Sequence, residues 1–549
     1  MDVTNDDEDK KFNFNPFVVT NMASWLQQSA GAWKETYNEF AAYSQKISES
    51  WPDALWKIWT NKQDPERREK VPLQGYEGNK KSKSNKKKMR ALVLQGGGAL
   101  GAFQAGAFKA LYEKITREDK ENGNEERPLF DIIAGTSIGA INATVLVSHV
   151  IENKTWKGSL EKLVAFWEYL SCPTPDITKI SANWKKQYDD NRPNVASEEA
   201  ARRYYSVKEL LKSGLEKVYS PLPPKVDEKF FDQENNRVLY NKQPLQKSIE
   251  KFVKFPIATS YERGEPRLLV STDVAEGVPV TFDSYEKGKD LNGKEIRKTV
   301  YSIGSTHEEK EKLQQPSVIE YNDGINVRHL MASASLPEFY EYEEIGGRSF
   351  WDGGLLSNTP IRELIQSHKD FWEYKLGSEE LENSILEKAS FSVPDLELYV
   401  VNLWHSNDNT IPSDPDGISE RHRDIKSHDQ YYVKESILLT HYVHLIEKLI
   451  RLSRNNNSYN YDLKKEINRI LRNYTASVNT TETSKTYLDI IKTQFEITKI
   501  ESIERRDDQD TISAKDGDFT SETIDNLIKD GYESAWKKHP QFIFQTSAK

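Results

Sequence analysis

The stretch Phe130-Asp131-Ile132-Ile133-Ala134-Gly135-Thr136-Ser137-Ile138-Gly139-Ala140 decides the fold of this chain. Its pattern is a short buried strand that ends in Gly-x-Ser-x-Gly and leads into a helix of small residues, the sequence form of a nucleophile elbow. Gly135 and Gly139 suit the tight turn, because a Cβ atom at either position would clash with neighbouring backbone. The turn presents the Ser137 hydroxyl beside a helix N-terminus, which favours negative charge. The pentapeptide alone is weak evidence, so the chain must supply the rest of a site.

A glycine-rich turn lies about 40 residues upstream. It follows the apolar strand 91–95 and precedes a helix, and its glycines are Gly96, Gly97, Gly98 and Gly101. The spacing matches G-x-G-x-x-G, which also occurs in dinucleotide folds. Those folds place an acidic residue about 20 residues further on, whereas here the next strand leads to Ser137. Backbone N–H groups of such a turn also hold the oxyanion of an acyl-transfer intermediate. We therefore predict an oxyanion turn, with phosphate binding as the alternative.

A serine nucleophile needs a base. Several histidines follow Ser137 in the order that an α/β-hydrolase triad requires, but none lies in a recognisable motif: His368, His405, His422, His428 and the histidines after them. Asp352 ends an aromatic strand and precedes Gly353 and Gly354. Burial there would raise the pKa of its carboxyl group and its basicity toward the serine proton. Taken alone, Asp-Gly-Gly also describes an ordinary turn.

The three motifs in this order, Gly-Gly-Gly-x-x-Gly, Gly-Thr-Ser-Ile-Gly and Asp-Gly-Gly, resemble the patatin-like phospholipase family. The segment 332–339, Ala-Ser-Ala-Ser-Leu-Pro-Glu-Phe, is similar to the one that precedes the Asp-Gly-Gly turn in that family, and Asn358 and Pro360 behind the turn also fit. The resemblance covers roughly residues 90–405 and extends neither to residues 1–89 nor to the last 140 or so residues.

This resemblance implies a Ser–Asp dyad that works without a catalytic histidine, a cofactor or a metal. By position, Ser137 is the nucleophile and Asp352 the base, with the four glycines of the upstream turn framing the oxyanion. One departure bears on the substrate. Many family members carry Lys or Arg next to the last glycine of that turn, where this chain has Leu100. A cation that would help to hold the turn or an anionic head group is therefore missing at that position.

Composition bounds the alternatives. The chain has 549 residues, 30% of them charged, and a formal net charge of −10, which argues against a general nucleic-acid binder. Its single cysteine, Cys172, excludes an intramolecular disulfide framework. The acidic N-terminus lacks the pattern of a signal peptide, and no apolar run is long enough for a membrane span. We therefore expect a cytoplasmic protein. Composition predicts neither its oligomeric state nor its acyl-chain specificity.

The N-terminal 89 residues divide into three parts. Residues 1–20 are predicted to be disordered. Residues 21–60 show an a/d-like spacing rich in aromatic residues, which favours a helical arm packed on protein, or an interfacial helix that lies on lipid. Residues 61–89 form a Lys-rich linker that is either a solvated connection or a contact with anionic lipid. Peripheral attachment to a membrane or a lipid granule through residues 21–89 is therefore a hypothesis.

The remaining chain is predicted to form a mostly parallel α/β domain and a helical tail. The strand–loop–helix–strand–helix order from residue 90 implies parallel strands with helical crossovers, and the family resemblance implies a three-layer sandwich over residues 90–405. Residues 152–255 are expected to be a charged insertion or cap, and residues 406–549 a C-terminal helical region. The favoured function is a serine acyl hydrolase acting in lipid catabolism on carboxylic esters of lipids. A storage-polyester hydrolase and a non-catalytic phosphate- or nucleotide-binding scaffold are the alternatives.

Overall fold

The computed structural model describes residues 88–176, 186, 198–222, 239–274, 278–285, 324–337, 339–345, 348–387, 392–404, 415–455, 461–476, 485–505 and 514–537. The predicted disordered segment 1–20, the helical arm 21–60 and all but two residues of the linker 61–89 lie outside these ranges. Those three predictions stay untested. Among the described helices, none combines the length and the apolar character that crossing a bilayer requires.

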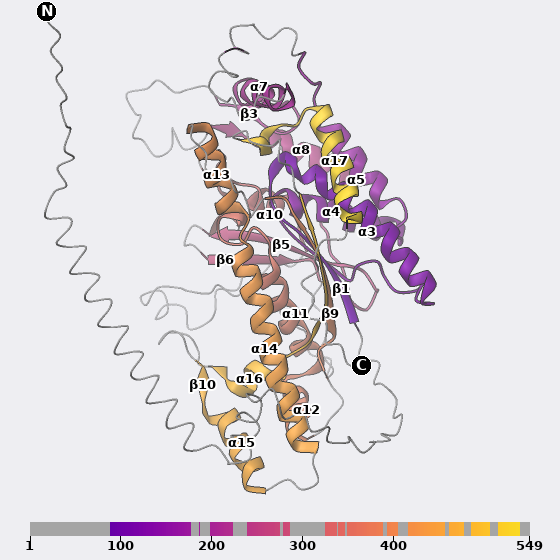
Figure 1. Cartoon of the computed structure of the whole chain (residues 1–549), viewed down its shortest axis with the longest axis vertical. Coiled ribbons are helices and arrows are strands. Elements are labelled where there is room, and N and C mark those ends of the chain that lie inside the picture. The colour runs from indigo at the N-terminus through magenta and orange to yellow at the C-terminus, as the bar shows by residue number, and fades with distance from the viewer. Residues whose placement is uncertain are drawn as a thin grey trace, which may run out of the picture. The chain divides into compact units, whose positions relative to one another are not determined.

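The described core is an eight-stranded sheet (Figure 1). Five strands run parallel in the order β12 (Ile497–Glu504), β9 (Asp395–Asn402), β1 (Lys88–Leu94), β2 (Ile132–Thr136) and β5 (Arg267–Val274). Three further strands are paired antiparallel: β6 (Val278–Asp283), β7 (Glu343–Ile345) and β8 (Arg348–Asp352). Strands β6 and β8 both pair with β5, and β7 pairs with β8. The predicted α/β class with a mostly parallel central sheet is confirmed.

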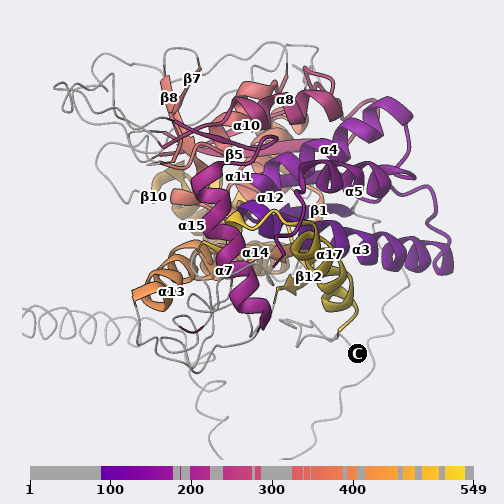
Figure 2. The same cartoon turned by 90° about the horizontal axis from the view of Figure 1, so that it is seen from above.

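Helices cover both faces of this sheet, as the alternating side chains of its strands require. Leu92 and Leu94 of β1 pack into one apolar core, whereas Ala91 and Val93 pack into the other. The first core lies under α3 (Ala102–Glu121), α4 (Ile138–Asn153), α5 (Ser159–Leu170) and α17 (Ser521–Trp536). The second lies mainly under α11 (Ile361–Leu376) and α12 (Ser378–Glu387). Figure 2 shows α3, α4 and α5 on the side of β1 opposite α11 and α12. The layers form the predicted three-layer sandwich.

The predicted C-terminal helical region differs from expectation, because it also contributes to the sheet. Beyond β9 the chain forms α13 (Pro415–Ser427), α14 (Gln430–Asn455), α15 (Tyr461–Asn473), β10 (Thr475–Ala476), β11 (Lys485–Thr486), α16 (Tyr487–Lys492), β12 and α17. Strand β12 pairs with β9 and adds an edge to the sheet. Its charged side chains are partly buried and paired: Glu501 lies 3.2 Å from Lys499 and 2.6 Å from Lys114 of α3. The sheet therefore continues past the predicted boundary at residue 405.

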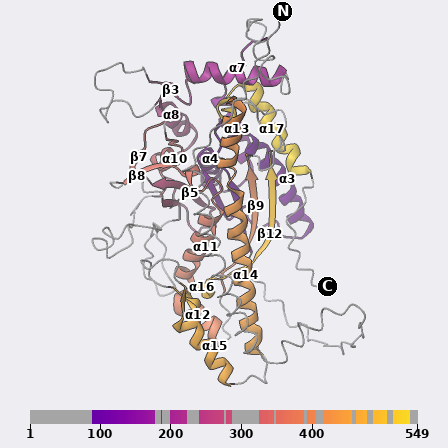
Figure 3. The ribbon, with the colours of Figure 1, turned by 60° about the vertical axis from the view of Figure 1, so that its left-hand side comes forward.

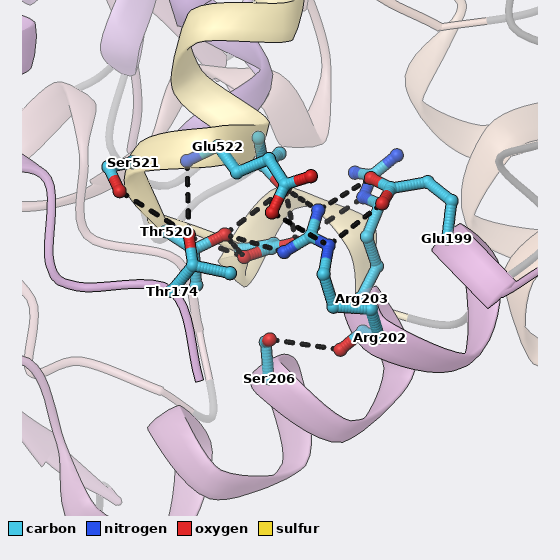
Figure 4. Close-up of polar contacts among 10 residues, drawn as sticks. Thr174, Glu199, Arg202, Arg203, Ser206, Thr520, Ser521 and Glu522 are labelled. Atoms are coloured by element: carbon cyan, nitrogen blue, oxygen red, sulfur yellow. Dashed lines mark hydrogen bonds and ion pairs between the residues drawn. The ribbon is translucent and has the colours of Figure 1, made fainter. Parts of the chain in front are cut away.

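The insertion 152–255 contains helices α5, α7 (Glu198–Ser213) and α8 (Gln243–Phe252) and the short strands β3 (Ser220–Pro221) and β4 (Tyr240–Asn241). Two buried arginines tie α7 to the C-terminal region (Figure 4). Arg202 donates to Thr520 at 3.1 Å and to Thr523 at 2.7 Å, and Arg203 Nε lies 3.3 Å from the carboxylate of Asp518. Because both guanidinium groups are paired, the charges are tolerated in the interior. The insertion is thus fixed to the segment that leads into α17.

Candidate active site

Ser137 is the single residue between β2 and α4, and few non-glycine residues adopt its backbone conformation. Its φ is 53° and its ψ is −125°, a strained geometry that persists only where the surroundings enforce it. The flanking glycines explain how the turn fits. A Cβ atom on Gly135 would lie 2.4 Å from the carbonyl carbon of Gly139, and one on Gly139 would lie 2.2 Å from the carbonyl oxygen of Leu94. The half-exposed side chain of Ser137 is thereby held at the cavity described below.

The register of β5 brings Asp352 beside the elbow. Thr136 pairs with Ser271, and Asp352 pairs with the next residue of β5, Thr272. Strand β8 therefore continues along β5 where β2 ends, and its last residue lies next to the residue that precedes Ser137. Asp352 is 5% exposed. Its Oδ1 accepts a 2.7 Å hydrogen bond from the Gly354 N–H, and its own N–H donates to the Ser335 carbonyl at 2.9 Å.

The two glycines after Asp352 have different roles. A Cβ atom on Gly353 would lie 2.6 Å from the Ser271 carbonyl oxygen, so β5 leaves no room for a side chain there. A Cβ atom on Gly354 would lie 3.0 Å from Asp352 Oδ1, the atom to which the Gly354 N–H donates. The short 3-10 turn Gly353–Leu355 thus holds the carboxylate by its own backbone.

The glycine turn closes over the serine. A Cβ atom on Gly96 would lie 3.1 Å from Ser137 Cβ, so the two backbones approach closely. The Gly96 N–H donates to the Asn358 carbonyl at 3.2 Å. In the hydrogen bonding of the described residues, by contrast, the N–H groups of Gly97 and Gly98 donate to no protein acceptor. Those two groups are available to an oxyanion, whereas Gly96 and Gly101 shape the turn; a Cβ atom on Gly101 would lie 2.7 Å from Ile138.

A buried polar network behind this turn was not predicted in full. The Asn358 side chain donates to the carbonyls of Gly96 at 3.2 Å and Ser427 at 2.6 Å. Asp429 accepts from the Thr359 N–H at 2.7 Å and from its hydroxyl at 2.6 Å. Burial raises the pKa of Asp429 to about 6 against the opposing effect of these hydrogen bonds. Asn358 stood next to a recognised motif, but no sequence pattern marked Asp429.

Two further side chains position the site from a distance in sequence. Ser333 accepts the Ser137 N–H at 2.8 Å and donates to the Ser271 carbonyl at 2.5 Å. Trp404, just after β9, donates from its indole nitrogen to the Gly96 carbonyl at 2.7 Å. Ser333 lies in the segment 332–339 whose similarity was noted, whereas Trp404 carried no signal. Both fix backbone atoms of the elbow and the turn.

A cavity of about 470 Å³ joins the three motifs. Ser137, Asp352 and the glycines 96–98 line it. Much of its wall is apolar or aromatic and consists of Ile138, Ile141, Leu170, Leu211, Val218, Tyr219, Tyr240, Leu245, Leu336, Phe339, Tyr340 and Phe519. Burial raises the pKa of Tyr219 and Tyr340, so both phenols stay neutral. The apolar part of the lining suits an acyl chain.

The candidate histidines are separated by the fold. His368 is buried in the core beneath α11, where its ring contacts Phe495 and Nε2 lies 2.9 Å from the Pro394 carbonyl. His405 lies outside the described residues. His422 on α13 does line the cavity. Of the four named histidines, it is the one that the described residues place in the cavity lining, so it is the rival to Asp352 as the base. Within the described residues, no group of three or more His, Cys, Asp or Glu side chains is arranged to hold a metal ion.

Comparison with known proteins gives a family match. The family model described as patatin-like phospholipase matches residues 92–365, which include all three motifs. A search of curated proteins finds no match. Among solved structures, the chain is similar to VipD from Legionella pneumophila at 13% sequence identity and a TM-score of 0.22. That alignment covers 81% of this chain and 66% of the VipD chain, so the chain spans slightly less than two thirds of that protein's length.

Proposed function

The chain belongs to the patatin-like phospholipase family, and from this premise we propose that it hydrolyses carboxylic esters of lipids through an acyl-serine intermediate. Members of this family are lipid acyl hydrolases. The observation that carries the finer proposal is the register of β5, which sets Asp352 beside the residue that precedes Ser137. Both side chains line one cavity with a largely apolar wall.

In the proposed first half-reaction, Ser137 Oγ attacks the ester carbonyl carbon while Asp352 accepts the hydroxyl proton. The carbonyl oxygen becomes an oxyanion held by the N–H groups of Gly97 and Gly98. Removing one such donor typically raises the barrier by about 3–4 kcal/mol. The C–O bond to the alcohol then breaks, and the leaving alkoxide takes the proton from Asp352. In the second half-reaction Asp352 accepts a proton from water, the hydroxide attacks the acyl carbon, and Ser137 recovers its proton as the acid leaves.

A serine-directed reagent tests the nucleophile directly. A fluorophosphonate reacts with an activated serine and forms a stable adduct that mass spectrometry assigns to one peptide. We expect a single adduct on Ser137, none in Ser137→Ala, and much slower labelling in Asp352→Asn because its amide does not accept the proton. Labelling at wild-type rate in Asp352→Asn would place the base elsewhere, with His422 as the next residue to test.

The other hypotheses remain separate. The storage-polyester substrate rests on the aromatic arm 21–60, and attachment to a lipid surface rests on residues 21–89, nearly all of which lie outside the described residues. Unchanged liposome flotation after deletion of residues 1–89 would contradict attachment. A phosphate- or nucleotide-binding scaffold predicts thermal stabilisation by nucleotide and no effect of Ser137→Ala. It leaves the strained Ser137 and the buried Asp352 without a role. A cytoplasmic location is likewise a proposal.

A further inference from the structure

One face of α13 contributes a polar part of the cavity lining. Ser419, His422, Arg423, Lys426 and Ser427 belong to it. Their spacing of three and four residues places them on one side of the helix. They line the same cavity as Ser137, Asp352, the glycine turn and the apolar wall. An ester lipid likewise combines an apolar acyl chain with a polar head group.

Two acidic residues of α13 are held in the interior. Glu420 and Asp424 are buried and pair with Lys515, whose Nζ lies 3.3 Å from Glu420 Oε1 and 2.9 Å from Asp424 Oδ1. Two carboxylates of α13 thus lie in the interior, whereas Arg423 and Lys426 of the same helix line the cavity. The ion pairs with Lys515 hold α13 in place beside the turn Lys515–Gly517.

The turn Lys515–Gly517 connects these cations to the oxyanion turn. Arg423 Nη1 lies 2.5 Å from Asp516 Oδ1. The backbone of Asp516 in turn packs on the glycine turn, because a Cβ atom on Gly98 would lie 2.3 Å from the Asp516 carbonyl oxygen. The cavity lining carries two cationic side chains, Arg423 and Lys426, and Arg423 is the one paired with Asp516. Both can donate charge-assisted hydrogen bonds to an anion that approaches the glycine turn.

Resting on the hydrolase function proposed above, we infer that Arg423 and Lys426 bind the phosphate of a lipid head group and give the enzyme a preference for anionic phospholipids. The family position next to the last glycine of the turn is Leu100, so no cation comes from there. Helix α13 lies outside the matched residues 92–365. The cations come instead from a part of the chain about 320 residues away in sequence, which the fold returns to the same turn.

The test uses three esters of equal acyl length, each below its aggregation concentration: dihexanoyl phosphatidylglycerol, dihexanoyl phosphatidylcholine and p-nitrophenyl hexanoate. We expect a higher kcat/KM for the anionic lipid than for the zwitterionic one. Arg423→Gln and Lys426→Gln each lower kcat/KM for phosphatidylglycerol by about tenfold or more, mainly through KM, as loss of a charge-assisted hydrogen bond predicts. Turnover of the nitrophenyl ester stays within about twofold. Lys434→Gln, an exposed charge change on α14, is the matched control.

Each other outcome has a definite meaning. Equal wild-type rates on the two phospholipids, with the nitrophenyl ester hydrolysed, would overturn the head-group inference and leave the hydrolase proposal standing. A loss on the nitrophenyl ester as large as that on phosphatidylglycerol, in both variants, would make α13 merely structural. Strong inhibition of nitrophenyl ester turnover by inorganic phosphate would assign the cations to a free anion. Wild type that hydrolyses none of the three esters and takes no fluorophosphonate would refute both proposals.

Discussion

Replacing Gly106 by alanine tests whether α17 is an integral part of the fold. Gly106 on α3 faces α17 so closely that a Cβ atom would lie 1.8 Å from the Ile528 carbonyl oxygen. The contact is reciprocal, since a Cβ atom on Gly531 of α17 would lie 2.0 Å from the Phe103 carbonyl oxygen. The two helices therefore meet backbone to backbone through their glycines.

Two effects of opposite sign compete in Gly106→Ala. Helix propensity favours alanine over glycine by about 1 kcal/mol. Against this, the Ile528 oxygen would lie about 1.6 Å inside the ordinary contact limit of 3.4 Å. A backbone oxygen cannot rotate away as a side chain does, so α17 must move as a unit, and overpacking of this kind costs about 1–3 kcal/mol or more. We expect the clash to win and the free energy of unfolding to fall by about 1–2 kcal/mol.

Urea denaturation followed by circular dichroism measures the change. Gly517→Ala is the control, because a Cβ atom there would meet only Val207 Cγ1 at 3.9 Å, an ordinary contact, and we expect its stability to stay within about 0.5 kcal/mol of wild type. A Gly106→Ala variant as stable as wild type, or more stable, would show that helix propensity outweighs the clash. That result would contradict the close contact between α3 and α17.

Three further substitutions probe the turn and its supports. Gly98→Ala places a side chain at φ 53° and 2.3 Å from the Asp516 carbonyl oxygen; ester hydrolysis should fall about 100-fold or more, and near-wild-type kcat would sink the oxyanion assignment. Asn358→Ala leaves the carbonyls of Gly96 and Ser427 without their side-chain donor, so denaturation should show a loss of about 1–3 kcal/mol; an unchanged midpoint would contradict this. Asp429 has a folded pKa of about 6, above its unfolded value near 3.9. The stability of wild type relative to Asp429→Asn is therefore greatest below pH 4 and falls by about 3 kcal/mol as the pH rises to 7; equal differences at both pH values would refute the burial argument.

The central site could be predicted from the sequence because each of its motifs is local. The elbow around Ser137, the glycine turn and the turn after Asp352 each need small residues at fixed spacing, and that need is visible within a few positions. The parallel sheet followed from the alternation of apolar strands and helices in the first part of the domain. The juxtaposition of Ser137 and Asp352 is a matter of register on β5, which spacing alone does not give.

The parts that sequence did not reveal are long-range. Strand β12 carries charged residues that find partners only in the fold, Glu501 with Lys114 of α3 and Lys499 with Tyr399 of β9, so it lacks the apolar pattern of β1 or β2. Asp429 acquires its raised pKa only when the fold buries it, and this burial outweighs its hydrogen bonds to Thr359, 70 residues away. Arg423 belongs to a charged helix that only the fold brings to the cavity, where Lys515 pairs with Glu420 and Asp424 of the same helix. Such features exist only after the chain has folded.

Hydrolysis of p-nitrophenyl hexanoate by wild type, Ser137→Ala, Asp352→Asn and His422→Gln tests the central claim most directly. The account predicts turnover by wild type, a loss of about 10³-fold or more in Ser137→Ala and in Asp352→Asn, and near-wild-type activity in His422→Gln, with all four proteins equally folded by circular dichroism. Near-full activity in Asp352→Asn together with an inactive His422→Gln would contradict the account, because the base would then be the histidine on α13.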